Sequence, residues 1–415
     1  MNHDKTIITY YSDNLEKFFY DFRKKEISYN EPQKFTRTAH LYGTIKIATQ
    51  YKGREKIRMK TKKFLETLLA GLTCLSFWSG TGEAADARWD DGVPRYTEAK
   101  VIIHEDGPNL LFSDSPEMVQ KCGVMYRDTV KGKFRLFFHH VNDTDSSKRL
   151  AIVLRRTGIR PALVQLGRNG ISDPNRDWLE AGKEAQIRYY GKQKETDPLR
   201  ISRMTDLLGL QKPTIIRPQE LVTGIVNLES DRPVEVSVMM IPVKTDLGLA
   251  LDAYGILPPD EGDHVLRGTF PASDVHVRLQ EAYPSNKLET WGIKLADDVL
   301  NPYVRGTDAT TGKKVVNYGN YGVMYDVILP TKGKRDTVLR FNPYGGPYAG
   351  AGLLSMNGEE AKEIKIPGHG LAFGWSHDGE TMVLGTIPEN GEATLHFSPP
   401  GSSNLPIRLF LSPKS

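Results

Sequence analysis

The sequence is poor in cysteine. Only Cys74 and Cys122 occur among its 415 residues, and Cys74 lies in a segment that we expect to be absent from the mature protein. A single remaining thiol cannot form an internal disulfide, so hydrophobic cores must hold the mature chain together. The span 88–415 is long enough for one or two domains with substantial cores. Cys122, which precedes a predicted strand, is expected to be a buried structural thiol.

The sequence also lacks an apolar run that could cross a membrane. Its one candidate, residues 67–78, has about twelve residues, whereas a helical span needs about 20. The run follows a basic patch and precedes small residues at the spacing that signal peptidase requires. These residues are Lys60, Lys62 and Lys63 before the run, and Gly82/Ala84 or Ala85/Ala87 after it. We predict a secretory signal peptide over 59–87, with Ala84 and Ala87 as cleavage residues. A buried amphipathic helix and an uncleaved anchor are the alternatives.

Residues 1–58 lack both an apolar core pattern and a series of strands separated by turns. A signal peptide normally opens the chain, so we expect translation to begin at Met59 and 1–58 to be an upstream extension of the reading frame. A mass spectrum of the natural protein with peptides from 1–58 would contradict this.

The mature part of the sequence has no excess of charge of either sign. Residues 1–87 hold 15 of the 55 Lys and Arg residues and 10 of the 51 Asp and Glu residues, which leaves 40 and 41 in 88–415. The net charge of +4 therefore comes from the segment that we expect to be lost. Nothing in this balance favours nucleic acid or an anionic membrane as partner.

Motifs of common catalytic sites are missing as well. The sequence has no Gly-x-Ser-x-Gly, no Cys–His set of recognisable spacing and no phosphate-binding glycine loop. Carboxylate pairs such as Asp297-Asp298 occur, but sequence cannot show whether two carboxyls face each other in a cleft. We therefore favour a binding or structural protein over an enzyme, and we expect no cofactor.

Short strand-like segments fill the rest of the chain. From Arg88 onward, runs of four to eight apolar or β-branched residues alternate with Gly, Pro, Asn and Asp clusters, which predicts an all-β fold. We expect three hairpins, which pair 134–141 with 149–155, 224–228 with 234–241, and 321–329 with 336–341. The alternation of Val234, Val236 and Val238 with polar residues is typical of an antiparallel sandwich with one wet face.

The predicted strands fall into two antiparallel β-sandwich units. The first covers 88–256 with a helical insert at about 174–210, in which 203–210 is compatible with a helix. A short helix near 246–254 precedes a linker at 257–263, where two prolines and several acidic residues continue neither element type. The second unit covers 264–415.

Four motifs resemble those of a known family. They are Ser115-Pro116-Glu117-Met118-Val119-Gln120 before Gly123-Val124-Met125, the strand from Gly132-Lys133-Phe134 to His139-His140, Ser230-Asp231-Arg232-Pro233-Val234, and Gly319-Asn320-Tyr321-Gly322-Val323. In this order, over about 95–345, they resemble an exported bacterial family, best represented in cyanobacteria, that is catalogued as a domain of unknown function. The resemblance implies an envelope or extracellular β-protein and supplies no activity.

Histidines supply one candidate site. His139, His140 and Asp143 could contribute to a copper or zinc site. Adjacent strand residues point to opposite faces, however, which favours one ring in the core and the other on the surface. His369 and His377 lie on a glycine-rich stretch without a familiar zinc spacing.

Tyrosines supply the other candidate site. Tyr318, Asn320 and Tyr321 lie in one glycine-rich turn, and Tyr344 and Tyr348 lie in another. Aromatic rings on a rigid scaffold can bind a sugar face at low entropic cost, so this set is a candidate glycan or peptidoglycan contact. Alternatively, the glycines permit positive φ angles and the tyrosines fill the rim of the core.

The sequence thus predicts an exported β-sandwich protein of the periplasm, cell surface or extracellular space. Its expected partner is a glycan or another envelope protein, with no membrane span in the mature form. A polysaccharide-acting hydrolase or lyase is the second hypothesis, and a histidine-based metal protein is the third.

Overall fold

The computed structural model describes residues 90–91, 93–262, 264–375 and 380–414. These residues belong to one compact unit, Ala84–Ser415. The expected extension 1–58, the expected signal peptide 59–87 with Ala84 and Ala87, and His377 lie outside the described residues.

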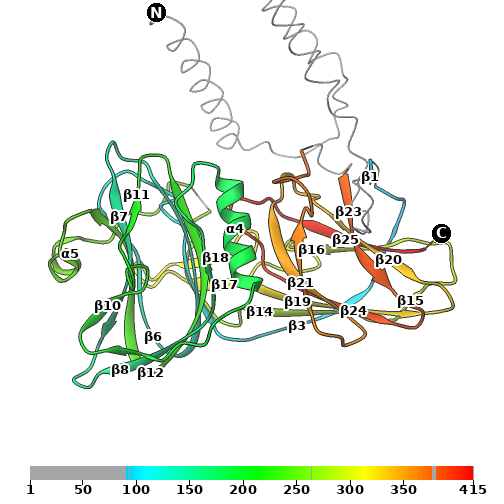
Figure 1. Ribbon diagram of the computed structural model, residues 1–415, viewed down its shortest axis with the longest axis horizontal. Coiled ribbons are helices and arrows are strands. Elements are labelled where there is room, and N and C mark those ends of the chain that lie inside the picture. The colour runs from blue at the N-terminus through cyan, green and yellow to red at the C-terminus, as the bar shows by residue number, and fades with distance from the viewer. Residues whose placement is uncertain (1–89, 92, 263, 376–379, 415) are drawn as a thin grey trace, which may run out of the picture. The chain divides into compact units, whose positions relative to one another are not determined.

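The fold is all-β, as predicted, and the strands form three sheets (Figure 1). The twelve-stranded sheet contains β4 (Asn109–Ser113), β5 (Met118–Val119), β6 (Gly123–Asn142), β7 (Lys148–Arg156), β8 (Ala162–Ile171), β9 (Leu199–Ile201), β10 (Met204–Asp206), β11 (Thr214–Ile216), β12 (Leu221–Pro242), β13 (Arg267–Phe270), β17 (Arg305–Thr307) and β18 (Lys314–Val316). The six-stranded sheet contains β1 (Asp90–Asp91), β2 (Thr97–Glu98), β16 (Trp291–Leu295), β20 (Thr337–Asn342), β23 (Glu380–Ile387) and β25 (Ile407–Pro413). The seven-stranded sheet contains β3 (Val101–Asp106), β14 (Asp274–Leu279), β15 (Tyr283–Pro284), β19 (Met324–Lys332), β21 (Gly350–Met356), β22 (Lys362–Ile366) and β24 (Glu392–Phe397).

The twelve-stranded sheet folds over itself to make the first sandwich. Its two long strands, β6 and β12, pair along their whole length, with a register shift between Ser230 and Val234. Beyond the shift β12 pairs with β7, and before it with β8. Side chains from both halves meet in one core, for example Phe138 with Val236. The predicted inward face of Val234, Val236 and Val238 is confirmed, because all three are buried.

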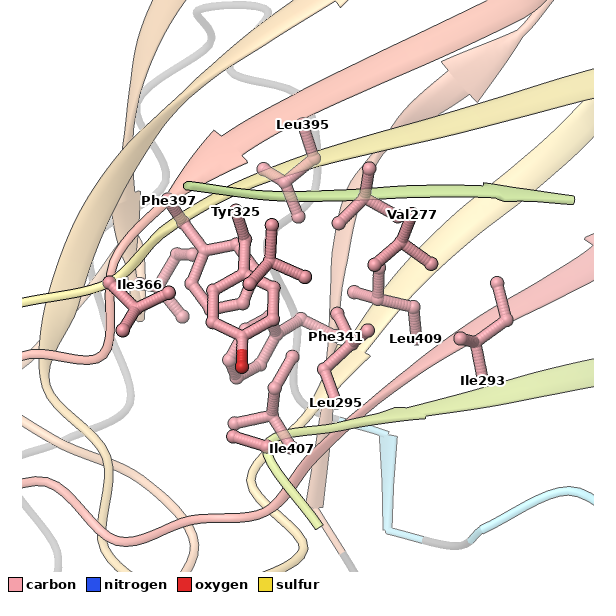
Figure 2. Close-up of a cluster of buried hydrophobic side chains, with 14 of the residues drawn as sticks. Val277, Ile293, Leu295, Tyr325, Phe341, Ile366, Leu395, Phe397, Ile407 and Leu409 are labelled. Atoms are coloured by element: carbon pink, nitrogen blue, oxygen red, sulfur yellow. The ribbon is translucent and has the colours of Figure 1, made fainter. Parts of the chain in front are cut away.

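The six- and seven-stranded sheets form the second sandwich. Alternate residues enter the core in several of these strands, as β14 shows with Val275 and Val277 inside. Figure 2 shows side chains from both sheets, such as Phe341 and Tyr325, converging on one another. Each large apolar side chain buried in this way stabilises the fold by about 1.5–3 kcal/mol. His276, the residue between these valines, faces away from the core.

The three expected hairpins are wrong, although their strands exist. The sheet order β7-β12-β6 places β12 between the strands of the first. Both strands of the second belong to β12 itself, which continues through the register shift at Ser230. The strands of the third, β19 and β20, lie in different sheets, so their connection crosses from one sheet of the sandwich to the other. Several pairs are also parallel, such as β4 with β6 and β14 with β19.

The predicted linker at 257–263 does not separate the strands into two sandwiches. The strands β13, β17 and β18, which follow it, join the twelve-stranded sheet. The early strands β1, β2 and β3 pair with β23, β16 and β14, all of which follow the linker. The described part of the chain therefore begins in the second sandwich, builds the first, and returns.

Two helices occur in the described residues. The helix α4 (Trp178–Tyr190) lies in the predicted insert and begins at Asp177, whose side chain accepts a hydrogen bond from the backbone of Glu180. It packs against β8 and β12 of the first sandwich and against β21 of the second. The helix α5 (Leu247–Ala253) confirms the helix predicted near 246–254. The helix considered at 203–210 is wrong, because β10 covers 204–206 and turn and bend residues follow it. Neither helix has the length and apolar character needed to span a bilayer.

Candidate functional site: a row of histidines and aspartates

His139 and His140 are both buried, which corrects the expectation that one ring lies on the surface. The Nε2 atom of His140 lies 2.8 Å from Ser113 Oγ, and its Nδ1 atom lies 2.9 Å from the carbonyl oxygen of Pro116. Burial lowers the pKa of His140 to about 4, against the effect of the Pro116 hydrogen bond. His140 is therefore a neutral, hydrogen-bonded core residue near neutral pH.

The predicted metal ligands do not converge. His139 Nε2 lies 3.4 Å from Ser402 Oγ and 3.9 Å from Glu117 Oε1, whereas Asp143 accepts hydrogen bonds from the side-chain amides of Gln120 and Gln219. Within the described ranges, no group of three or more His, Cys, Asp or Glu residues is arranged to hold a metal ion.

A buried carboxyl directly follows Ser113, the residue that contacts His140. Asp114 follows β4 and is 8% exposed, and its Oδ1 atom has no hydrogen-bond partner among the described residues. Burial, followed by the charges of Glu117 and Asp260, raises its pKa well above the usual value. Asp260 is fixed at this place by Ser115, whose hydroxyl donates to its carboxylate over 3.0 Å.

Cys122 is half-buried, less enclosed than expected. Burial raises the pKa of its thiol, so the thiolate that reacts and binds metals is disfavoured.

Two of the five predicted ligand-binding residues belong to the core. Tyr348 is fully buried, with its ring centroid 4.8 Å from that of Phe341. Asn320, at φ 50°, is also buried, and its amide donates to Tyr325 Oη over 2.7 Å. A small polar side chain tolerates this left-handed conformation and satisfies buried polar groups around it.

The other three tyrosines do not form one exposed surface. Tyr318 packs against His264, with ring centroids 3.9 Å apart. Tyr321 is half-buried, and its hydroxyl donates to the carbonyl oxygen of Ser403 over 2.8 Å. Tyr344 is 38% exposed and is the one predicted ligand-binding residue in the exposed class.

The structure brings a different set of residues together on the second sandwich. His276 of β14 pairs directly with His104 of β3 on one side and with Asp326 of β19 on the other. Asp326 in turn pairs with His396 of β24. These strands lie side by side in the seven-stranded sheet (Figure 1). With Asp106, which lies two residues beyond His104, they make up what we call the His–Asp row.

Hydrogen bonds and ion pairs link the members of the row. His276 Nε2 lies 2.9 Å from Asp106 Oδ1, and its Nδ1 lies 3.2 Å from Asp326 Oδ2. The other oxygen of Asp326 accepts a short hydrogen bond from His396 Nδ1. His104 Nε2 lies 3.6 Å from Asp106 Oδ2. The His104 ring stacks on the His276 ring, with the ring centroids 6.1 Å apart. His276 thus has a carboxylate at each ring nitrogen.

This arrangement favours charged forms at its centre. The hydrogen bond to Asp106, aided by the charge of Asp326, raises the pKa of His276 despite some burial. Burial alone would raise the pKa of Asp326, but the hydrogen bond from His396 and the nearby positive charges hold it below its usual value. Protonation of His276 is therefore favoured by the carboxylates at its two ring nitrogens.

The row faces away from the core and is accessible. Its side chains are between 33% and 72% exposed. Ion pairs flank it, with Arg278 bonded to Glu392 over 3.1 Å and Arg135 to Asp274 over 2.8 Å. Accessible donors and acceptors in fixed positions can form hydrogen bonds to a polar ligand.

Sequence reasoning missed the row. Each member occupies a polar position in an alternating strand, such as DVHVRL in β14, which reads as an ordinary wet face. Only the register of four strands, drawn from distant parts of the chain, aligns them.

Comparisons with known proteins identify no relative. No family model matches the chain and no curated protein matches it, so the resemblance to the cyanobacterial family stays a prediction. Among solved structures, salicylate 1,2-dioxygenase from Pseudoaminobacter salicylatoxidans is 11% identical over 87% of this chain and 91% of its own, with a TM-score of 0.11. PNGF-II is 9% identical over 75% and 65%, with a TM-score of 0.13, and oxalate decarboxylase from Bacillus subtilis is 8% identical over 74% and 76%, with a TM-score of 0.10. These TM-scores are too low to support an argument about fold or function.

Proposed function

We propose that the protein is an exported binding module that holds a glycan against the outer face of its seven-stranded sheet. The observation that supports this is the His–Asp row, a set of accessible side chains that is joined by hydrogen bonds and ion pairs and crosses four strands. The export part of the proposal rests on the sequence pattern of 59–87.

The chemistry of the row suits a polyhydroxylated ligand. The carboxylates of Asp106 and Asp326 accept hydrogen bonds from hydroxyl groups, and His396 Nε2 accepts one when the ring is neutral and donates one when it is protonated. Three strand spacings of about 4.8 Å make the row about 14 Å long, which suits an oligosaccharide better than a single sugar. Aliphatic side chains beside the row, Ile102 and Ile328, offer contacts for the apolar faces of sugar rings.

A polysaccharide-acting enzyme is the second candidate, and the Asp326–His396 pair favours it. A carboxylate that binds one imidazole nitrogen orients the ring and stabilises its protonated form, which leaves the other nitrogen able to take a proton from water or from a sugar hydroxyl.

A glycan array combined with a reducing-sugar assay tests both candidates. We expect the wild-type protein to bind oligosaccharides on the array, and Asp326→Asn to bind at least about tenfold more weakly, the effect of losing about 1.4 kcal/mol. Asp336→Asn is the matched control, because Asp336 is a similarly exposed carboxylate that pairs with Lys414. Release of reducing ends would favour the enzyme. An array without binding, or equal binding by wild type and Asp326→Asn, would contradict the proposed face.

A further inference from the structure

Two exposed aromatic side chains lie on neighbouring loops at one corner of the second sandwich. Among the described residues, Tyr344 at 38% and Trp375 at 64% are the aromatic side chains of the exposed class. They come from the loop after β20 and from the stretch before β23. We call these two residues the aromatic corner.

Backbone contacts hold the two loops against each other. Tyr348 N donates to the carbonyl oxygen of Phe373 over 2.9 Å, and Phe373 N donates to that of Tyr348 over 3.2 Å. Gly374 has a φ of 91°, and a Cβ there would lie 2.5 Å from the carbonyl oxygen of Gly346. Only glycine permits so close an approach, so the backbone next to Trp375 is fixed directly against the loop that carries Tyr344.

The buried side chains of the same loops anchor them to the core. Phe373 and Tyr348 both pack on Phe341, with ring centroids 6.0 and 4.8 Å away. The loops of the aromatic corner are therefore held by side chains that pack in the core. This preorganisation lowers the entropic cost of binding.

The Tyr344 ring is held from one side. The guanidinium carbon of Arg408 lies 3.9 Å from its centroid, and Arg408 Nε donates to Asn342 Oδ1 over 2.9 Å. Arg408 is buried, and its Nη2 atom has no hydrogen-bond partner among the described residues. A cation against one face of the ring fixes the orientation of Tyr344. The exposed part of this side chain combines an apolar ring with a polar hydroxyl group.

We propose that the aromatic corner is a second ligand contact, at which a pyranose ring of a neutral glycan stacks on Trp375 and meets the edge of Tyr344. The inference rests on the proposed glycan-binding function, since it assigns the same class of ligand to a separate place. A sugar fits better than an apolar peptide because both side chains are amphipathic aromatics and a guanidinium, rather than aliphatic side chains, lies behind Tyr344.

The test uses the whole protein labelled with 5-fluorotryptophan and titrated with chitotetraose or cellotetraose. The chain has five tryptophans, and the spectrum of Trp375→Phe assigns the signal of Trp375. We expect this signal to shift as the oligosaccharide binds, and Trp375→Ala to lower the affinity about tenfold, the upper range for one aromatic contact. Leu288→Ala is the control, because Leu288 is an exposed apolar residue elsewhere, and it should bind like wild type.

The outcomes separate this inference from the proposed function. If the oligosaccharide binds the wild type without moving the Trp375 signal, and Asp326→Asn abolishes that binding, the aromatic corner is overturned. The His–Asp row then stands. A shifted Trp375 signal that persists in Asp326→Asn supports the corner as a separate contact, and an unchanged affinity of Asp326→Asn in the same titration contradicts the row. If neither oligosaccharide binds, or if Trp375→Ala binds like wild type, the corner is overturned.

Discussion

His140 in the first sandwich and His276 in the second both have a polar partner at each ring nitrogen, yet their surroundings differ. His140 meets a hydroxyl and a carbonyl inside the protein, and burial lowers its pKa to about 4. His276 meets two carboxylates on an accessible sheet face, and its pKa is raised. The comparison teaches that a histidine on a strand is recognised as a core or surface residue by its partners, not by its position in the sequence.

The same contrast extends to arginine. Arg267 is fully buried beside the first sandwich, where its Nε donates to Asp308 over 2.9 Å. It also donates to the carbonyl oxygens of Met125 and Leu257. Arg278 beside the His–Asp row is about half exposed.

The largest expected effect comes from breaking the buried pair. Arg267→Ala leaves Asp308 buried without its cation and should lower the free energy of unfolding by about 3–5 kcal/mol. Arg278→Ala should lower it by less than about 1 kcal/mol, because its pair with Glu392 is solvated. Urea unfolding at pH 7 measures both, and equal losses would contradict the division into buried and accessible polar groups.

The next effect is an acid-linked loss of stability at His140. Its pKa in the folded protein is about 4, below the value of about 6.5 in the unfolded chain. The unfolded chain therefore takes up the proton first, and stability falls as the pH drops from about 6.5 to 4, by about 3 kcal/mol in all. Unfolding measured across this range should show a smaller acid loss for His140→Gln than for wild type. The same slope in both proteins would show that other groups cause it.

Asp114 should act in the opposite direction. Because its pKa is raised in the folded protein, the stability that its protonated form confers is present below the unfolded value of about 3.9 and is lost as the pH rises through the folded pKa. Asp114→Asn removes the buried charge and should stabilise the protein at pH 7 by at least about 1 kcal/mol. A lower melting temperature for this variant at pH 7 would mean that the carboxylate has a partner in solution.

The smallest expected effect is at His276. Its raised pKa means that its contribution is present below about pH 6.5 and is lost as the pH rises through the folded pKa. Because the side chain is more than a third exposed, His276→Gln should cost well under 1 kcal/mol at pH 6. Proton NMR titration of the histidine rings should give a midpoint above 6.5 for His276 and near 4 for His140. Matching midpoints would remove the contrast between the two sandwiches.

Much of the fold could be predicted from local pattern. The alternation that places Val234, Val236 and Val238 inside identifies a strand whatever its partner, and the segments at 246–254 and in the insert do contain helices. Pairing could not be predicted, because nearest neighbours in sequence are not always neighbours in a sheet. The residues after Ser230 resemble a turn in sequence, because they include Asp and Pro. In the structure they form a register shift within one long strand, β12.

The candidate site was less predictable than the fold. Asn320 and Tyr348 lie in glycine-rich turns that suggest loops, yet both side chains point into packed structure because each satisfies or fills a buried place. Conversely, His104, His276 and His396 are far apart in sequence and come together only through strand register. Tyr344 is accessible, as the sequence suggested. Trp375 was recognised only from the structure, because its loop packs against the loop that carries Tyr344.

The most direct test of the central claim is a crystal structure of the protein soaked with chitotetraose. The account predicts electron density for the sugar along the His–Asp row, with hydroxyl groups within hydrogen-bond distance of Asp326 and His396. Sugar density at another place, with the row contacting only solvent, would contradict it.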